Sequence, residues 1–153
     1  MTVEVRLAPD SFDPATELAA ITSAAAGAGA VVSFVGLARG QGRDGTAVES
    51  LFLDHHPRLT EQSLVEIGAA AAERFDVAAV RIVHRCGTVA AGEAIVFAAA
   101  AARHRRAAFE AADYLMDRLK TDAVFWKRED GVDGSRWIEP TEADRADRAR
   151  WKS

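Results

Sequence analysis

The chain has 153 residues, of which 49% are hydrophobic and 27% charged, and its formal net charge is −4. This length and composition predict a soluble globular domain with a substantial core, and the negative charge argues against general nucleic-acid binding. A single cysteine, Cys86, excludes an internal disulfide and any metal site built from several cysteines. The N-terminus shows no signal-peptide pattern and no apolar run is long enough to cross a membrane, so we expect a cytoplasmic protein.

The first part of the chain alternates between predicted strands and helices. Residues 3–7 alternate apolar and polar side chains, which predicts a half-buried strand. Asp13-Pro14 places a capping side chain before a proline at the first helical position, so we expect a helix that begins there and ends at Gly27. The apolar, β-branched run over residues 30–35 predicts a buried strand.

The stretch from Gly36 to Gly45 holds four glycines and two arginines, which predicts a mobile loop with cationic side chains. One interpretation of this loop is an anion clasp, and the other is a flexible connection with solvated arginines. The stretch matches no Walker or dinucleotide-binding pattern, and its composition alone favours the flexible connection.

The alternation continues through the middle of the chain. A strand is expected over residues 48–55 and is ended by Pro57, and Thr60 is expected to cap a helix that reaches residue 75. Two further strands are expected on either side of a turn at Gly87, over residues 77–84 and 94–101.

The stretch from Arg103 to Glu129 is where we expect the chemistry. A basic cluster over residues 103–106 precedes an amphipathic helix that ends near Lys120, and a short apolar run then leads to Lys127. Two lysines flanking Val-Phe-Trp are a less ordinary pattern than a solvated helix face. The apolar face of the helix is expected to contain residues spaced by three and four: Phe109, Ala112, Met116 and Leu119.

The last part of the chain predicts a hairpin and a charged helical tail. Gly131 and Gly134 bracket a turn that leads to a strand over residues 135–139. The tail, residues 140–153, is charge-rich and helical from Thr141, and its Trp151 suggests docking onto the domain. We therefore predict one α+β domain over residues 1–153, with packed helices and a mainly antiparallel sheet.

A series of short blocks stands in order between about residue 30 and residue 139. The blocks are Phe34-Val35-Gly36 with Arg39, Asp54-His55-His56-Pro57, Val83-His84-Arg85-Cys86-Gly87, His104-Arg105 with Ala108-Phe109-Glu110-Ala111, Leu119-Lys120-Thr121, Phe125-Trp126-Lys127-Arg128-Glu129 and Trp137-Ile138-Glu139. Together they resemble the large, catalytic subunits of molybdopterin synthase, the MoaE family. The resemblance implies the α/β-hammerhead fold.

The resemblance also implies an activity and its partners. The family is a sulfurtransferase that converts cyclic pyranopterin monophosphate into the dithiolene of molybdopterin, a step in molybdenum cofactor biosynthesis. Sulfur comes from the C-terminal Gly-Gly thiocarboxylate of a small ubiquitin-like subunit, in two transfers through a half-sulfurated intermediate. The family assembles as a heterotetramer around a homodimer of large subunits. Neither a cofactor nor a metal is expected, and no nucleic-acid or membrane partner.

Site residues follow from the matched positions. Lys120 and Lys127 match the family's catalytic lysines, and we expect Lys120 to act at the acyl group and Lys127 to bind substrate and transfer protons. The residues expected to bind substrate are Leu37, Ala38, Arg39, His104, Arg105, Lys120, Lys127, Arg128 and Glu129. The residues expected to form the pocket wall are Phe34, Met116, Phe125 and Trp126. Outside the resemblance, surface salt bridging explains the basic residues equally well.

Two departures and two alternatives stay open. The family usually has an arginine that reaches the other protomer, where this chain has Thr141, and Arg145 is a candidate replacement. Cys86 is interpreted as a small buried hydrophobe and not as a sulfur carrier. The alternatives are a non-catalytic adaptor for a ubiquitin-like carrier, and an unrelated phosphate-ester enzyme that uses the glycine-rich loop.

Overall fold

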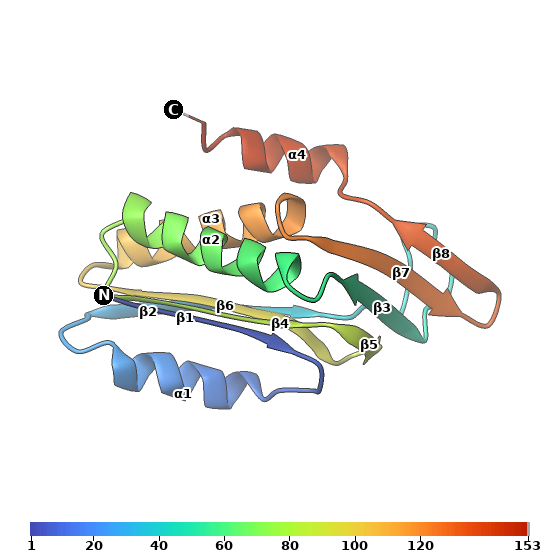
Figure 1. Ribbon diagram of the computed structural model, residues 1–153, viewed down its shortest axis with the longest axis horizontal. Helices are drawn as coiled ribbons and strands as arrows, with labels where there is room; N and C mark the ends of the chain where they lie inside the picture. Colours follow the sequence, from blue (N-terminus) through green and yellow to red (C-terminus); the bar gives the residue numbers. More distant parts are fainter. Residues whose placement is uncertain (153) are drawn as a thin grey trace.

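The computed structural model describes residues 1–152 and contains two four-stranded sheets with four helices (Figure 1). The strand order of the first sheet is β1-β4-β6-β2, and these strands span Thr2–Ala8, Ala79–Arg85, Ala94–Ala102 and Ala30–Leu37. The pairing of β1 with β4 is parallel, and the other two pairings are antiparallel. The first sheet is therefore mainly antiparallel, as predicted.

Strand β6 explains why the first sheet has a core on both faces. Successive side chains of a strand point to opposite faces, and the alanine-rich β6 buries both sets. Ala98, Ala100 and Ala102 join one cluster, while Phe97 and Ala99 join the other. Small side chains on a central strand let helices pack closely on either side.

The helices form a layer on each face of the first sheet. Helix α1 (Pro14–Ala24) packs on one face, and α2 (Leu59–Arg74) and α3 (Arg105–Thr121) pack on the other (Figure 1). Asp13 caps α1 as predicted, because its carboxylate accepts a hydrogen bond from the backbone N–H of Ala15 at 3.0 Å.

A second, fully antiparallel sheet extends beside the first one. Its strand order is β5-β3-β7-β8, and the strands span Gly87–Ala90, Ser50–His55, Phe125–Gly131 and Gly134–Ile138. The chain passes from β4 into β5 at Cys86 and Gly87, and Gly87 has a φ of +80° that a side chain would strain. The sequence predicted β3 and the β7–β8 hairpin, but it did not predict β5, where only a turn was expected at Gly87, or the division of the strands into two sheets.

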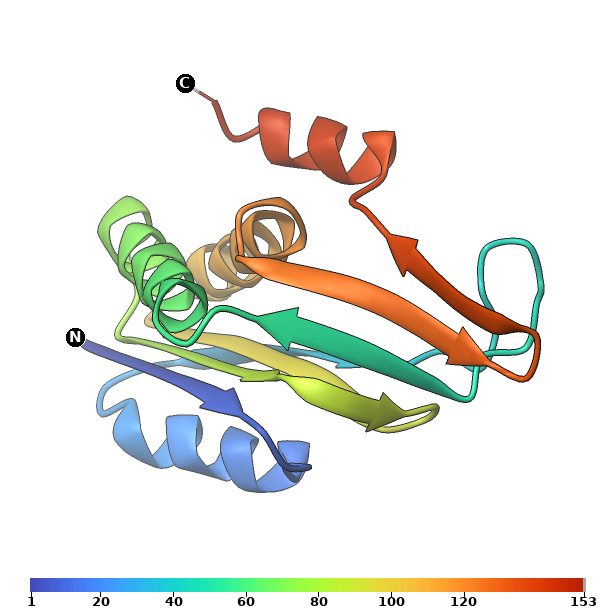
Figure 2. The same ribbon diagram turned by 45° about the vertical axis from the view of Figure 1, so that its right-hand side comes forward.

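Helix α4 (Glu142–Ala149) lies above α3 on the same side of the sheet as α2 (Figure 2). The Arg150 guanidinium lies 2.7 Å from the Asp113 carboxylate and 2.8 Å from that of Asp117. Trp151 donates its indole N–H to Asp117 and packs edge-on against Tyr114. The C-terminal segment is therefore anchored on α3 by ion pairs and an aromatic contact.

Two local predictions were wrong. Thr60 does not cap α2, because Arg58 occupies the N-cap position and the Thr60 side chain is fully buried inside the first turn. Phe109 is 59% exposed and does not belong to the buried face of α3, which consists of Ala108, Ala111, Ala112, Tyr114, Leu115 and Leu119. Within residues 1–152, no helix is long and apolar enough to cross a membrane.

Candidate active site

The two lysines approach each other because α3 and β7 meet at a tight connection. Lys120 lies in the last turn of α3, and Lys127 is the third residue of β7. Since side chains alternate along a strand, Phe125, Lys127 and Glu129 point to the inner face of the second sheet. The lysine that follows Trp126 therefore faces the end of the helix that carries Lys120.

Two hydroxyl groups of α2 fix the backbone where the chain enters β7. The Thr60 hydroxyl donates to the Val124 carbonyl at 2.6 Å, and the Val124 N–H donates to the Ser63 hydroxyl at 3.1 Å. The Thr60 hydroxyl also accepts the His56 N–H at 2.8 Å. Thr60, which the sequence placed as a cap, instead sets the position from which Lys127 is presented.

Three adjoining cavities are lined by both Lys120 and Lys127. The α4 cavity, of about 520 Å³, lies between the end of α3, the β7–β8 hairpin and the start of α4. The β2 cavity, of about 310 Å³, lies between β2, β4, β6 and α3, and the loop cavity, of about 340 Å³, lies under residues 37–43. The two lysines therefore lie where the three cavities meet.

The environment of Lys127 lowers the pKa of its ammonium group to about 8. Burial is the largest cause, since it disfavours the charged form, and repulsion from the nearby Lys120 ammonium adds to it. The Asp144 carboxylate acts in the opposite direction. A lysine with a pKa near neutrality can both stabilise an anion and exchange a proton at physiological pH.

His84 forms the floor of the β2 cavity beneath the lysines. Its ring stacks on Phe125 with the centroids 4.1 Å apart, and its Nδ1 lies 2.8 Å from the Arg85 carbonyl. Burial, with smaller contributions from the charges of Lys127 and Lys120, lowers the pKa of His84 to about 3. The ring is neutral at physiological pH, so donation from Nδ1 leaves Nε2 as an acceptor.

The loop after β2 carries Arg39 to the lysine site. Arg39 lines the β2 and loop cavities together with Leu37. The loop is tied to the hairpin, because Arg43 donates to the Glu139 carbonyl at 3.1 Å and Arg136 bridges Asp44 and Glu129. The prediction of a mobile loop therefore overlooked contacts to residues about ninety positions away.

The cavities bring together most of the predicted site. Leu37, Arg39 and Glu129 lie with the lysines, and the predicted wall residues line the same cavities: Phe34, Met116, Phe125 and Trp126. Ala38 is different, since its side chain is buried and its backbone bonds to Gly92 and Glu93.

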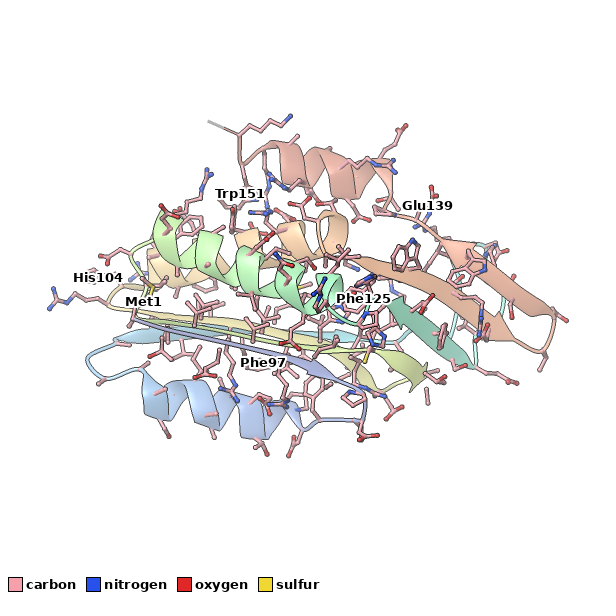
Figure 3. The ribbon with its side chains drawn as sticks, viewed as in Figure 1. Met1, Phe97, His104, Phe125, Glu139 and Trp151 are labelled. Carbon is pink, nitrogen blue, oxygen red and sulfur yellow. The ribbon has the colours of Figure 1, made fainter. Side chains whose placement is uncertain are left out.

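Besides Ala38, three predicted substrate-binding residues lie outside these cavities. Arg128 points to the outer face of β7, where it pairs with Asp130 at 2.6 Å and lies over the rings of Phe52 and Trp137. His104 and Arg105 are at the start of α3, and sixteen residues of helix place them about 24 Å from Lys120. Figure 3 shows His104 at one end of the molecule and Phe125 well away from it.

Comparisons with known proteins establish the family of the chain. The family model described as MoaE protein matches residues 7–122. The chain belongs to the MoaE family. A molybdopterin synthase catalytic subunit from Caulobacter vibrioides is 48% identical over 96% of both chains, and one from Pseudomonas aeruginosa is 44% identical over 97% of this chain and 98% of its own. The solved MoaE protein of Burkholderia ambifaria has a TM-score of 0.82 and 38% identity, with 97% of each chain covered.

In this MoaE chain, sequence reasoning missed several residues of the site. Arg43, Trp137 and Asp144 line the α4 cavity beside the lysines, and Arg145 does so as well. For Arg145, the sequence indicated only that it could replace the arginine that the family usually has at the position of Thr141. The sequence signal near Asp144 was a Thr-x-x-Asp capping pattern, which predicts a helix start and says nothing of the lysines.

The described part of this MoaE chain, residues 1–152, holds no group of three or more His, Cys, Asp or Glu side chains arranged for a metal ion. The charged groups that meet at the cavities are instead mainly cationic, with Arg39, Arg43 and Arg145 around the two lysines. Such a set suits anionic ligands, because arginine offers several fixed donors and lysine a compact charge.

Proposed function

We propose that this chain is the catalytic subunit of a molybdopterin synthase, a sulfurtransferase of molybdenum cofactor biosynthesis that acts in the cytoplasm. It transfers sulfur from the thiocarboxylate of a small ubiquitin-like carrier to cyclic pyranopterin monophosphate. The observation that carries the proposal is the lysine pair, which borders three adjoining cavities large enough for an extended peptide end and a small anion. Family membership supplies the identity of the two substrates.

The lysines have distinct roles in the proposed reaction. The thiocarboxylate sulfur displaces an oxygen substituent from a carbon of the pterin precursor, so that a carbon–sulfur bond forms as a carbon–oxygen bond breaks and the oxygen leaves with a proton. Water then adds to the acyl carbon and cleaves the acyl carbon–sulfur bond. The carrier leaves with a carboxylate while the sulfur stays on the precursor. Lys120 stabilises negative charge at the acyl group, and Lys127, whose pKa is about 8, binds the precursor and transfers protons. A second transfer completes the dithiolene.

The phosphate of the precursor is held by arginines from more than one place. Arg39 supplies donors from the loop, and Arg145 from α4. His104 and Arg105 are exposed and about 24 Å away along α3. They therefore reach a lysine site only from a second copy of the chain, in agreement with the homodimer at the centre of the family's heterotetramer.

Single-turnover conversion tests the proposed function. The purified chain is mixed with thiocarboxylated carrier and cyclic precursor, and the dithiolene product is measured for wild type, Lys120→Ala and a matched control, Lys152→Ala. Wild type and the exposed-lysine control are expected to react alike, and Lys120→Ala at least about 100-fold more slowly. Carrier binding without product from wild type would favour the adaptor. Hydrolysis of a phosphate ester without sulfur transfer would favour the second alternative.

A further inference from the structure

The Asp144 carboxylate is held in a fixed position and lines the same cavities as the two lysines. It lies in the first turn of α4, and it lines both the α4 cavity and the loop cavity with Lys120 and Lys127. Its Oδ2 accepts the backbone N–H of Thr141 at 2.9 Å, while the Thr141 hydroxyl accepts the Asp144 N–H at 3.0 Å. This capping box holds the carboxylate in one orientation.

Asp144 differs from the aspartates on which α4 docks. Asp113 and Asp117 pair with Arg150, and Asp122 pairs with Arg118 and Arg148, so their charges are used in docking the helix. The ion pairs formed among residues 1–152 do not include Asp144. Its negative charge is therefore directed at the cavities and acts on the two ammonium groups across them.

The other charged groups around Lys127 leave Asp144 as a distinct influence. The cations on the loop and on α4 are Arg39, Arg43 and Arg145, and Lys120 ends α3. His84 on β4 is neutral, because burial lowers its pKa to about 3. Of the remaining carboxylates, Glu129 is paired with Arg136 at 3.0 Å. Glu139 also lines the α4 cavity, but it is exposed to solvent where β8 leads into α4 (Figure 3).

We infer that Asp144 is a positioning residue of the lysine site, whose fixed carboxylate on α4 favours the ammonium form of Lys127. It does so from the C-terminal helix, so docking of α4 on α3 completes the electrostatics of the site. The consequence for sulfur transfer rests on the proposed function. The consequence for Lys127 does not, since it concerns the protein alone.

The sign of the effect follows from Coulomb attraction. A carboxylate near an ammonium favours the charged form, and the Asp144 charge indeed raises the pKa of Lys127 against the larger opposing effects of burial and Lys120. Asp144→Asn keeps the side-chain shape and an oxygen that can accept the Thr141 N–H, but removes the charge. The lysine is then deprotonated at a lower pH, and the site loses positive charge as the solution becomes alkaline.

Competitive acetylation of the full chain tests this inference without relying on activity. The rate of Lys127 modification by acetic anhydride is measured by mass spectrometry against pH for wild type, Asp144→Asn, Asp144→Glu and Asp147→Asn. Asp147 is exposed on the same helix, so the last variant removes an equal charge away from the cavities. The Lys127 titration midpoint is expected to fall by about half a pH unit in Asp144→Asn only, and Asp144→Glu restores it.

Single-turnover rates supply the second readout. The alkaline limb of the pH–rate profile is expected to move to lower pH in Asp144→Asn and to stay in place in Asp147→Asn. An unchanged Lys127 midpoint in Asp144→Asn, or an equal fall in both asparagine variants, would overturn the inference. Absence of product from wild type would instead refute the proposed function and leave the acetylation result to decide the role of Asp144.

Discussion

Replacing Lys127 by methionine is expected to stabilise the fold while removing a residue of the reaction. The lowered pKa means that the folded state disfavours the ammonium form relative to the unfolded state. Below pH 8 both states carry the charge, so the folded protein bears the whole cost. As pH rises from 8 to 10.5 the folded state loses its proton first, and the cost disappears. Methionine has a similar shape and no charge to bury.

The magnitude follows from the two pKa values. The difference between 10.5 and about 8 corresponds to about 3 kcal/mol at pH 7. The side chain is partly exposed, so water screens part of this cost. We therefore expect Lys127→Met to raise the free energy of unfolding by about 1–3 kcal/mol at pH 7, and the gain to shrink to about half at pH 9.5.

Urea denaturation at the two pH values measures this difference, with Lys152→Met as the control for removing an exposed lysine. The control is expected to match wild type within about 0.5 kcal/mol. A Lys127→Met variant no more stable than wild type at pH 7 would refute the reasoning. So would a gain of equal size at both pH values, because that gain would come from packing and not from the buried charge.

Three further outcomes are expected. Thr60→Val lowers the free energy of unfolding by about 2–4 kcal/mol, because the Val124 carbonyl and the His56 N–H lose their partner. Urea denaturation measures this loss, and the exposed control Thr22→Val changes the free energy of unfolding by less than about 0.5 kcal/mol. An equal loss in both variants would contradict the role of the Thr60 hydroxyl. Cys86→Ala keeps the single-turnover rate within about twofold, because the thiol is buried and burial raises its pKa; loss of turnover in a folded variant would identify Cys86 as a participant. Trp151→Ala speeds hydrogen exchange of the α4 amides at least about tenfold, because the indole anchors the helix through Asp117 and Tyr114. Unchanged exchange would show that the ion pairs of Arg150 are enough to hold α4 on α3.

Local sequence patterns predicted the elements well and the proximity of the lysines in particular. Lys120 and Lys127 are seven positions apart, and a helix end followed at once by a strand brings them together whatever the rest of the fold does. The β7–β8 hairpin and the Asp13 cap are equally local. Such features depend on the few residues that form them, so periodicity and capping chemistry were sufficient.

The wrong prediction for Phe109 has a physical cause that the sequence contained only in part. Phe109 was placed in the core because it is large and apolar, yet the close approach of α3 to β6 requires alanines, so Ala108 and Ala111 are buried instead. The prediction that His104 binds substrate is different, because the helix separates it from Lys120 of the same chain by about 24 Å and only a second copy can bring the two together.

Long-range contacts could not be predicted from the chain. Nothing near Asp144 in the sequence shows that α4 folds back over the lysine site, because that position depends on ion pairs with Asp113 and Asp117 about thirty residues earlier. Arg128 is the opposite case. It follows Lys127 directly, and strand alternation, a local feature of the sequence, turns it to the opposite face of the sheet, where it pairs with Asp130.

The most direct measurement of the central claim follows the sulfur itself. Carrier thiocarboxylate prepared with a heavy sulfur isotope is supplied in excess with the cyclic precursor, and the mass of the pterin product is determined. The account predicts a product that contains two heavy sulfur atoms, with the carrier recovered as its carboxylate, and formation of that product lost in Lys120→Ala. A pterin without heavy sulfur, formed beside a carrier that keeps its thiocarboxylate, would contradict sulfur transfer at the lysine pair.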